Sequence, residues 1–420
     1  MFDFSSFLSN KAFITEDHHV YTYADLLGLS ERFSEHLVPR SLIFIGCENS
    51  LESIVAYVSC LRSGVVPLLL SRDVPDETLY HLEAIYHPRY CWFPSRRDLL
   101  VKGKEKYSLG GYSLIQYDGD SPVLPEGLAL LLTTSGSTGS PKLVRLSHDN
   151  LKSNACSIIE YLKITSSEKA ITSLPMYYSY GLSVLNSHLL AGATLLLTDK
   201  SYVQREFWKF VLEEKATSFA GVPFTYEILK KMRFEKFLPS SVKVMTQAGG
   251  KLNSSLIKYF SEYARLHDIR FYVMYGQTEA TARMSYLPAE YTLNKVGSVG
   301  VAIPGGHFSL IDEDGMRIVS PNVEGELVYE GSNVFWGYAE SLDDLFKGDE
   351  NKGILYTGDL AYVDSEGFYY ISGRKKRFLK LYGNRISLDF VESIVKDHCQ
   401  ECACVGSDDK LIVYVTDLDK

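Results

Sequence analysis

The segment Leu128–Lys142, LALLLTTSGSTGSPK, joins a short apolar run to a loop rich in glycine and hydroxyl groups. The run Leu128–Leu132 ends abruptly at this loop, as expected for a short strand that is buried on both faces. Gly136 and Gly139 permit a positive φ, so consecutive N–H groups can converge on an anion. Lys142 adds a positive charge, and hydroxyl donors come from Thr133, Thr134, Ser135, Ser137 and Thr138. The segment therefore predicts a phosphate-binding loop.

Two other kinds of segment share part of this composition. A solvated Ser/Gly linker does, but a linker has no reason to lie between an apolar run and Pro141-Lys142. A Walker P-loop requires GxxxxGK followed by Ser or Thr, whereas the lysine here follows proline and precedes leucine. The segment instead resembles the phosphate loop of the adenylate-forming family, which includes acyl-CoA synthetases, adenylation domains of nonribosomal peptide synthetases and beetle luciferases.

The composition indicates a globular metabolic enzyme. The chain has 420 residues, 45% of them hydrophobic, and its 43 basic and 52 acidic residues give a net charge of -9. This balance offers no positive surface for nucleic acid or anionic lipid. The start, MFDFSSFLSN, lacks the features of a signal peptide, and no apolar run is long enough for a membrane span. Seven cysteines do not form a disulfide framework at this length, so we expect a cytoplasmic protein.

The chain before the loop has the pattern of a βαβ unit. A strand is expected at Leu42–Ile45, a helix from about Asn49 to Gly64, and a second strand at Val65–Leu70. This order predicts a mostly parallel sheet with helices on both faces. Residues 100 to 127 have a poorer pattern, and we expect an irregular connection there.

The segment after the loop predicts a helix from Leu151 to Leu162 and then the aromatic stretch Ser173–Gly181, SLPMYYSYG. In the resembling family this stretch brings a side chain to the wall of the acyl pocket, and Tyr178 has that position here. Amino-acid-activating members have an aspartate nearby. The stretch has no acidic residue, which favours a simple carboxylic acid as substrate, although its tyrosines could instead only pack the core.

Two glycines follow the expected strand Val242–Met245. Gly249 and Gly250 therefore lie at the carboxyl end of a parallel strand, where ligands bind in open α/β sheets. They would let an adenine ring lie against the backbone. A Gly-Gly pair before a helix is more often only a turn, so this signal is weak alone.

A stronger signal follows the expected strand Phe271–Met274. The residues Tyr275-Gly276-Gln277-Thr278-Glu279 match the tyrosine, glycine, threonine and glutamate of the resembling family at the same spacing. Tyr275 offers a ring face for adenine, Thr278 offers a hydroxyl for the α-phosphate, and Glu279 offers a carboxylate for Mg²⁺. We expect Thr278, Glu279 and Lys142 to be the catalytic residues.

Closely spaced glycines from about residue 284 to residue 370 predict a small antiparallel sheet or barrel. Within it, Tyr356-Thr357-Gly358-Asp359-Leu360 again matches the family in order. Asp359 is well placed to accept hydrogen bonds from both ribose hydroxyls. An Asx-type turn is the alternative role for this aspartate.

The last motif, Ser372–Ile386, reads SGRKKRFLKLYGNRI. As a charge run it could be only a solvated hairpin. The resemblance implies that Arg374 contacts the ribose and that Lys376 is the hinge of a small C-terminal domain, with Lys380 also in register. Such a hinge lets one active site perform two half-reactions in turn.

The chain departs from the family after this motif. Complete members continue for roughly another hundred residues and supply a lysine for adenylation, a cation whose loss often costs about 10²- to 10³-fold in rate. None of the lysines at 376, 380, 396, 410 and 420 has the expected context. We therefore expect that the chain is cut short, or that it is naturally truncated and the lysine comes from elsewhere, or that the lysine is not needed. His398 and the nearby cysteines lack the paired spacing of a metal knuckle.

The resemblance implies an α/β fold with a large N-terminal domain, residues 1–372, built from two stacked, mostly parallel sheets with helices and a small β-barrel subdomain at about 284–370. A small, incomplete α+β lid domain, 373–420, would follow.

The implied function is an ATP-dependent, AMP-forming acid ligase that makes an acyl-adenylate with Mg²⁺ and passes the acyl group to CoA or the phosphopantetheine of a carrier protein. A half-catalytic acyl-nucleotide binding protein and an amino-acid-activating ligase are the alternatives. The expected nucleotide ligands are Thr134, Ser135, Gly136, Ser137, Thr138, Gly139, Gly249, Gly250, Tyr275, Gly276, Asp359, Arg374 and Lys380, and the expected pocket residues are Tyr178, Gly181, Val222, Thr281 and Met284.

Overall fold

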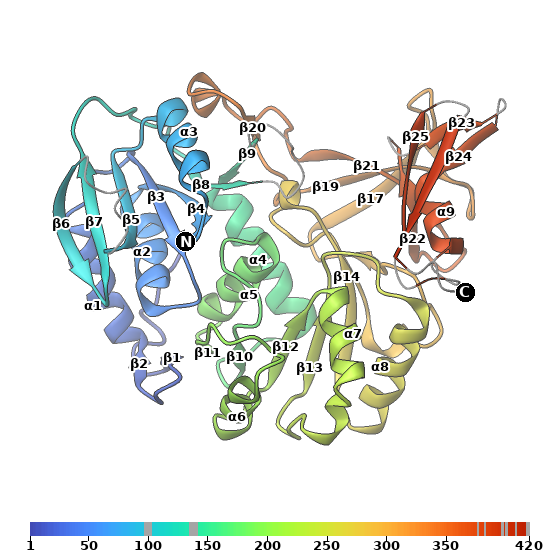
Figure 1. Ribbon diagram of the computed structural model, residues 1–420, viewed down its shortest axis with the longest axis horizontal. Coiled ribbons are helices and arrows are strands. Elements are labelled where there is room, and N and C mark those ends of the chain that lie inside the picture. The colour runs from blue at the N-terminus through green and yellow to red at the C-terminus, as the bar shows by residue number, and fades with distance from the viewer. Residues whose placement is uncertain are drawn as a thin grey trace.

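The computed structural model describes residues 1–95, 103–133, 142–375, 378–381, 384–395, 399, 402–407 and 410–416. Two large sheets lie side by side in it, and a smaller sheet and the C-terminal elements follow at one end (Figure 1). None of the helices in these ranges has the length and hydropathy needed to cross a lipid bilayer.

The first large sheet has eight strands in the order β20-β9-β8-β4-β3-β5-β7-β6. Strands β3, β4, β5 and β8 run parallel, and the remaining strands are antiparallel to their neighbours. The strands are β3 (Leu42–Cys47), β4 (Val66–Ser71), β5 (Tyr90–Pro94), β6 (Gly103–Leu109), β7 (Tyr112–Tyr117), β8 (Leu128–Thr133), β9 (Leu143–Ser147) and β20 (Gly337–Ala339), and the helices between them are α2 (Leu51–Ser63) and α3 (Asp76–Tyr86).

The second large sheet has nine strands in the order β16-β15-β14-β13-β12-β10-β11-β1-β2. Its central strands are parallel, whereas β2, β15 and β16 are antiparallel to their neighbours. The strands are β1 (Lys11–Ile14), β2 (Val20–Thr22), β10 (Lys169–Ile171), β11 (Thr194–Leu196), β12 (Ser218–Gly221), β13 (Val244–Gln247), β14 (Arg270–Tyr275), β15 (Ser285–Leu287) and β16 (Val301–Ala302). The helices are α1 (Tyr23–Ser34), α4 (His148–Leu162), α5 (Ser179–Leu190), α6 (Arg205–Glu213), α7 (Pro223–Lys231) and α8 (Ser254–Leu266).

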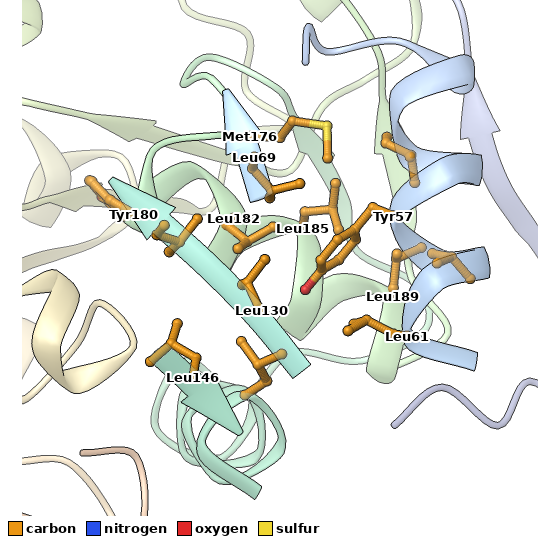
Figure 2. Close-up of a cluster of buried hydrophobic side chains, with 14 of the residues drawn as sticks. Tyr57, Leu61, Leu69, Leu130, Leu146, Met176, Tyr180, Leu182, Leu185 and Leu189 are labelled. Atoms are coloured by element: carbon orange, nitrogen blue, oxygen red, sulfur yellow. The ribbon is translucent and has the colours of Figure 1, made fainter. Parts of the chain in front are cut away.

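Helices α1, α2, α4 and α5 share one hydrophobic core with the facing sides of both large sheets. Figure 2 shows side chains of α2, α5 and three strands of the eight-stranded sheet pointing toward one another in this core. The outer faces of the sheets have separate cores, one with α6, α7 and α8 and one with α3. Strand β8 is buried on both faces because Leu130 and Leu132 face the central core whereas Leu131 faces the outer one. The predicted α/β fold with two stacked sheets is confirmed.

A third sheet has five antiparallel strands in the order β18-β17-β19-β21-β22. Its strands are β17 (Gly306–Ile311), β18 (Arg317–Ile318), β19 (Gly325–Gly331), β21 (Ile354–Val363) and β22 (Tyr369–Arg374). Two hairpins and a helix follow it: β23 (Phe378–Leu381) with β24 (Asn384–Ser387), α9 (Leu388–Val395), and β25 (Cys402–Ser407) with β26 (Lys410–Val415).

Two sequence-based expectations about elements were wrong, and one strand, β9, was not predicted. The irregular connection expected at 100 to 127 contains the hairpin β6–β7, whose first strand is largely exposed at a sheet edge and therefore lacks a clear hydrophobic alternation. The loop after β8 leads back into the antiparallel strand β9 before α4 begins. Ser50, rather than Asn49, caps α2.

Candidate functional site

Asp359 lies at the centre of a polar cluster formed where β14, β21 and β22 meet. Its Oδ2 accepts hydrogen bonds from the hydroxyl of Tyr275 at 2.5 Å and from Nε2 of Gln277 at 2.9 Å. Arg374 is the cross-strand partner of Asp359, and its Nε lies 3.5 Å from Oδ1. We call Tyr275, Gln277, Asp359 and Arg374 the Asp359 cluster. The side chain of Asp359 is almost fully buried, whereas that of Arg374 is largely exposed.

The phenol of Tyr275 is the donor in this cluster at neutral pH. Burial, and then the charge of Asp359, raise the pKa of Tyr275 far above its ordinary value, so the hydroxyl keeps its proton. Within the turn that carries Asp359, the hydroxyl of Thr357 accepts a hydrogen bond from the backbone N–H of Asp359 at 3.1 Å. The Asp359 carboxylate itself accepts hydrogen bonds from Tyr275 at the end of β14 and from Gln277 just after it, whereas an Asx-type turn would use the carboxylate within its own turn.

A second group of polar side chains contains Glu279 and Tyr338, which is on β20, together with Lys142 just before β9 and Glu340 just after β20. Oε1 of Glu279 accepts a hydrogen bond from the hydroxyl of Tyr338 at 2.6 Å. Nζ of Lys142 forms an ion pair with Oε1 of Glu340 at 2.7 Å and lies 5.7 Å from the centroid of the Tyr338 ring. We call Lys142, Glu279, Tyr338 and Glu340 the Glu279 cluster. Among the described residues, no group of three His, Cys, Asp or Glu side chains could by itself hold a metal ion.

Three of the expected pocket and nucleotide residues come together around Gly249. A Cβ placed on Gly249 would lie 2.5 Å from the hydroxyl of Tyr178 and 3.1 Å from Val222, and its φ of +81° also disfavours other residues. We call Tyr178, Val222 and Gly249 the Gly249 group. The next residue of α5, Ser179, has its Oγ 3.1 Å from Oγ1 of Thr278. The Gly249 group and the Tyr275–Glu279 motif are therefore neighbours.

The remaining expected residues have other surroundings. A Cβ on Gly181 would meet the carbonyl of Pro175, one on Gly250 would meet Pro223, and one on Gly276 would meet the carbonyl of Ala282. Thr281 is buried and donates to the carbonyl of Asn333 at 2.6 Å, and Met284 is part of the central core. Thr134, Ser135, Gly136, Ser137, Thr138, Gly139 and Lys376 lie outside the described residues, and Lys380 is described only as part of strand β23.

Sequence reasoning gave no role to several residues that contact the expected site. Gln277 was inside a quoted motif, but a glutamine has no single characteristic chemistry. Ser179 and Tyr338 gave no signal of their own because their partners are distant in sequence. Arg283 gave a usable signal, since it is a charged residue between the apolar Ala282 and Met284.

Comparisons with known proteins agree with the fold described above. The sequence profile of the AMP-binding enzyme family matches residues 6–339. A 2-succinylbenzoate–CoA ligase of Bacillus cereus is 32% identical over 427 aligned positions, which cover 96% of this chain and 86% of that protein. The corresponding ligase of Bacillus subtilis is 26% identical and is covered to 82%. The solved o-succinylbenzoate CoA synthetase of Bacillus subtilis, in complex with its acyl-adenylate intermediate, has the same fold, with a TM-score of 0.79 at 24% identity over 97% of this chain and 85% of that one.

The family match confirms the predicted activity class, an AMP-forming ligase that activates a carboxylic acid as its acyl-adenylate. The two alternatives, a binding protein without turnover and an amino-acid-activating ligase, find no support in these relatives. The chain belongs to the AMP-binding enzyme family.

Proposed function

We propose that this enzyme joins 2-succinylbenzoate, or a closely similar keto acid with two carboxylates, to coenzyme A. The observation that supports this most is the 32% identity, over nearly the whole chain, to a protein named as a 2-succinylbenzoate–CoA ligase. The relatives are named as CoA ligases, so we propose coenzyme A rather than a carrier-protein phosphopantetheine as the acyl acceptor. The free state of all seven cysteines fits a reducing compartment, and we propose the cytoplasm.

We assign the Asp359 cluster to the nucleoside of ATP. The donor set suits it, because a buried carboxylate can accept hydrogen bonds from both ribose hydroxyls while Arg374 lies beside it. The ring of Tyr275 would lie against adenine, and the bare backbone of Gly249 and Gly250 would allow the close approach of a flat ring. Thr134–Gly139, Gly276 and Lys380 complete the proposed nucleotide ligands.

The Glu279 cluster suits the phosphates and Mg²⁺. Mg²⁺ is commonly held by one or two carboxylates together with phosphate oxygens, and its charge would neutralise the triphosphate. Glu279 would supply the carboxylate, the ammonium of Lys142 would face the phosphates, and the hydroxyl of Thr278 would contact the α-phosphate. The acid carboxylate attacks the α-phosphate in line and pyrophosphate leaves; the thiol of coenzyme A then attacks the acyl carbonyl and AMP leaves. The side chains act by positioning and by charge rather than as a nucleophile.

We also propose that the chain divides near residue 372, with a domain at 1–372 and a lid domain from 373 that turns about Lys376 between the two half-reactions. The residues Tyr178, Gly181, Val222, Thr281 and Met284 would enclose the acid.

Carboxylate-dependent exchange of pyrophosphate into ATP tests the proposed activity. The panel should contain 2-succinylbenzoate, 3-benzoylpropionate, benzoate, short and branched fatty acids, and amino acids, with thioester formation followed after coenzyme A is added. We expect exchange and thioester to be greatest with 2-succinylbenzoate. Exchange with a fatty acid or an amino acid alone would contradict the proposed substrate.

A further inference from the structure

Arg283 is a buried cation for which the chemistry proposed so far has no use. Its side chain is among the largest fully buried ones, with the residue only 2% exposed. Nε donates to Oγ of Ser183 at 3.0 Å, Nη1 donates to the hydroxyl of Tyr161 at 3.0 Å, and the guanidinium lies 5.1 Å from the centroid of the Tyr180 ring. Within the described ranges, no Asp or Glu forms an ion pair with it. A positive charge buried without an anion lowers the stability of the fold, so we looked for a function that would explain this residue.

The position of Arg283 relates it to the point where the acid is activated. Ser179 and Ser183 lie on the same face of α5, four residues and therefore about 6 Å apart along the helix axis. Ser179 contacts Thr278, whereas Ser183 contacts Arg283. The backbone of Arg283 also packs directly behind the nucleotide motif, since a Cβ on Gly276 would lie 2.9 Å from Cα of Arg283. The serine that contacts the guanidinium therefore lies about one helical turn further along α5 than the serine that contacts the Thr278 hydroxyl.

A small cavity adjoins this guanidinium between α5 and the nine-stranded sheet. Its walls are mainly apolar and include Val184, Ala220, Val244, Thr246, His188 and Arg283. Tyr180 connects the cavity to the Gly249 group, because its ring lies 6.3 Å from that of Tyr178 and its hydroxyl lies 2.8 Å from Oγ1 of Thr246.

Two other titratable groups line the cavity. Burial lowers the pKa of His188 to about 4, so this imidazole is neutral at pH 7 and adds no positive charge. Glu168 lies just before β10, at the amino end of the sheet, and its carboxylate accepts a hydrogen bond from Thr217. Of the described residues that line this cavity, Arg283 is therefore the one that carries a positive charge at pH 7.

We infer that Arg283 selects acids that carry a second carboxylate, by pairing with that carboxylate. This inference rests on the proposed function, and it assigns a specificity residue for it. In 2-succinylbenzoate a short chain and one edge of the ring separate the two carboxylates, a separation comparable to one turn of α5. Movement of the Tyr180 side chain from Thr246 would open the way to the guanidinium. A guanidinium can bind a carboxylate through two parallel hydrogen bonds.

The test compares two acids in the Arg283→Gln variant of the full chain. The first is 2-succinylbenzoate, and the second is 3-benzoylpropionate, which lacks the ring carboxylate and is otherwise the same. We expect wild type to prefer the diacid. In the variant, kcat/KM for the diacid should fall roughly 10- to 100-fold, whereas kcat/KM for 3-benzoylpropionate should change less than about threefold. Arg283→Lys should restore part of the preference because it keeps the charge and loses the planar fork.

The matched control is Tyr161→Phe, which removes one partner of the guanidinium and leaves the charge in place. It should affect both acids equally. Calorimetric binding of each acid in the presence of a non-hydrolysable ATP analogue provides a readout apart from turnover. Equal losses for both acids in Arg283→Gln and Arg283→Lys, or a wild-type preference for the monoacid, would overturn the inference. Wild type that activates neither acid would refute the proposed function itself and this inference with it.

Discussion

The side of the site that we propose for the nucleotide and the side that we propose for the acid, called here the nucleotide side and the acid side, are built in different ways. On the nucleotide side, the turn after β14 and the register of β21 with β22 bring the Asp359 cluster together, and its polar groups contact one another. On the acid side, Tyr178 at the N-cap of α5 and one residue from each of the loops after β12 and β13 form the Gly249 group, and the Tyr180 ring lies between Tyr178 and the buried guanidinium of Arg283. Backbone geometry thus places the residues that we propose for the nucleotide, whereas we expect a few side chains to select the acid.

The largest effect is expected from Asp359→Ala. The change removes an acceptor shared by Tyr275 and Gln277 and leaves the buried Tyr275 hydroxyl without that partner. Each hydrogen bond to a charged group is worth about 1.5–3 kcal/mol, so kcat/KM for ATP should fall roughly 10²- to 10³-fold. The KM of the acid should change little, because the acid side does not use this carboxylate. Steady-state kinetics with each substrate varied in turn provide the measurement.

The matched control for this variant is Asp314→Ala, which removes an exposed carboxylate at the turn between β17 and β18. It should leave both kinetic constants at the wild-type values. If Asp359→Ala used ATP normally, or if the KM of the acid rose as much as that of ATP, the division of the site into a nucleotide side and an acid side would be contradicted.

The next effect concerns His188, on the acid side, and depends on pH. Burial lowers its pKa from 6.5 to about 4, so between these values the unfolded chain binds a proton that the native protein does not. The free energy of unfolding should therefore fall as the pH drops from about 6.5 toward 4, by up to about 1.4 kcal/mol per pH unit from this residue. Urea unfolding of His188→Leu should show a smaller loss over this range, whereas the exposed His307→Leu should not differ from wild type.

A smaller effect is expected from Tyr338→Phe, on the nucleotide side. The hydroxyl of Tyr338 holds the Glu279 carboxylate at 2.6 Å, so its loss leaves this side chain freer to rotate. The cost should be that of one hydrogen bond to a charged group, about 1.5 kcal/mol, or roughly tenfold in the Mg²⁺ concentration for half-maximal rate. Titration of Mg²⁺ at saturating ATP measures this. An unchanged Mg²⁺ requirement would mean that Tyr338 does not position Glu279.

The sequence could predict the elements that a local pattern of residues determines. Strand β8, the βαβ unit and the turn after β14 were predictable because local pattern determines them: apolar runs, a glycine stop and a motif of fixed spacing. The β6–β7 hairpin was missed because β6 is a largely exposed edge strand. Such a strand carries polar residues on both faces, so its sequence lacks the alternation of apolar and polar residues that predicts a strand.

The contacts between side chains were less predictable. Asp359 and Tyr275 were each identified, but their hydrogen bond depends on how two sheets meet, which no local pattern encodes. The pairing of Lys142 with Glu340 follows from the register of β9 with β20, and β9 itself was not expected. On the acid side, Arg283 contacts Tyr161 of α4 and Ser183 of α5, which lie 122 and 100 residues earlier in the chain. The sequence therefore showed only that a charged residue stands in an apolar stretch.

The smallest effect is expected from Glu340→Gln. In the structure the ammonium of Lys142 pairs with Glu340, and both side chains are about half exposed. Exposed ion pairs of this kind are worth about 0.2–1 kcal/mol, because water and salt screen the charges.

If Lys142 must leave Glu340 to face the phosphates of ATP, the variant should bind ATP up to about fivefold more tightly at low salt, and the gain should shrink as ionic strength rises. Calorimetric titration of ATP at two salt concentrations measures both features, with Glu330→Gln, an exposed carboxylate on β19, as the matched control. Weaker binding in Glu340→Gln would instead mean that Glu340 helps to hold the cation in place, and the nucleotide side would then be as fully assembled around its phosphates as it is around Asp359.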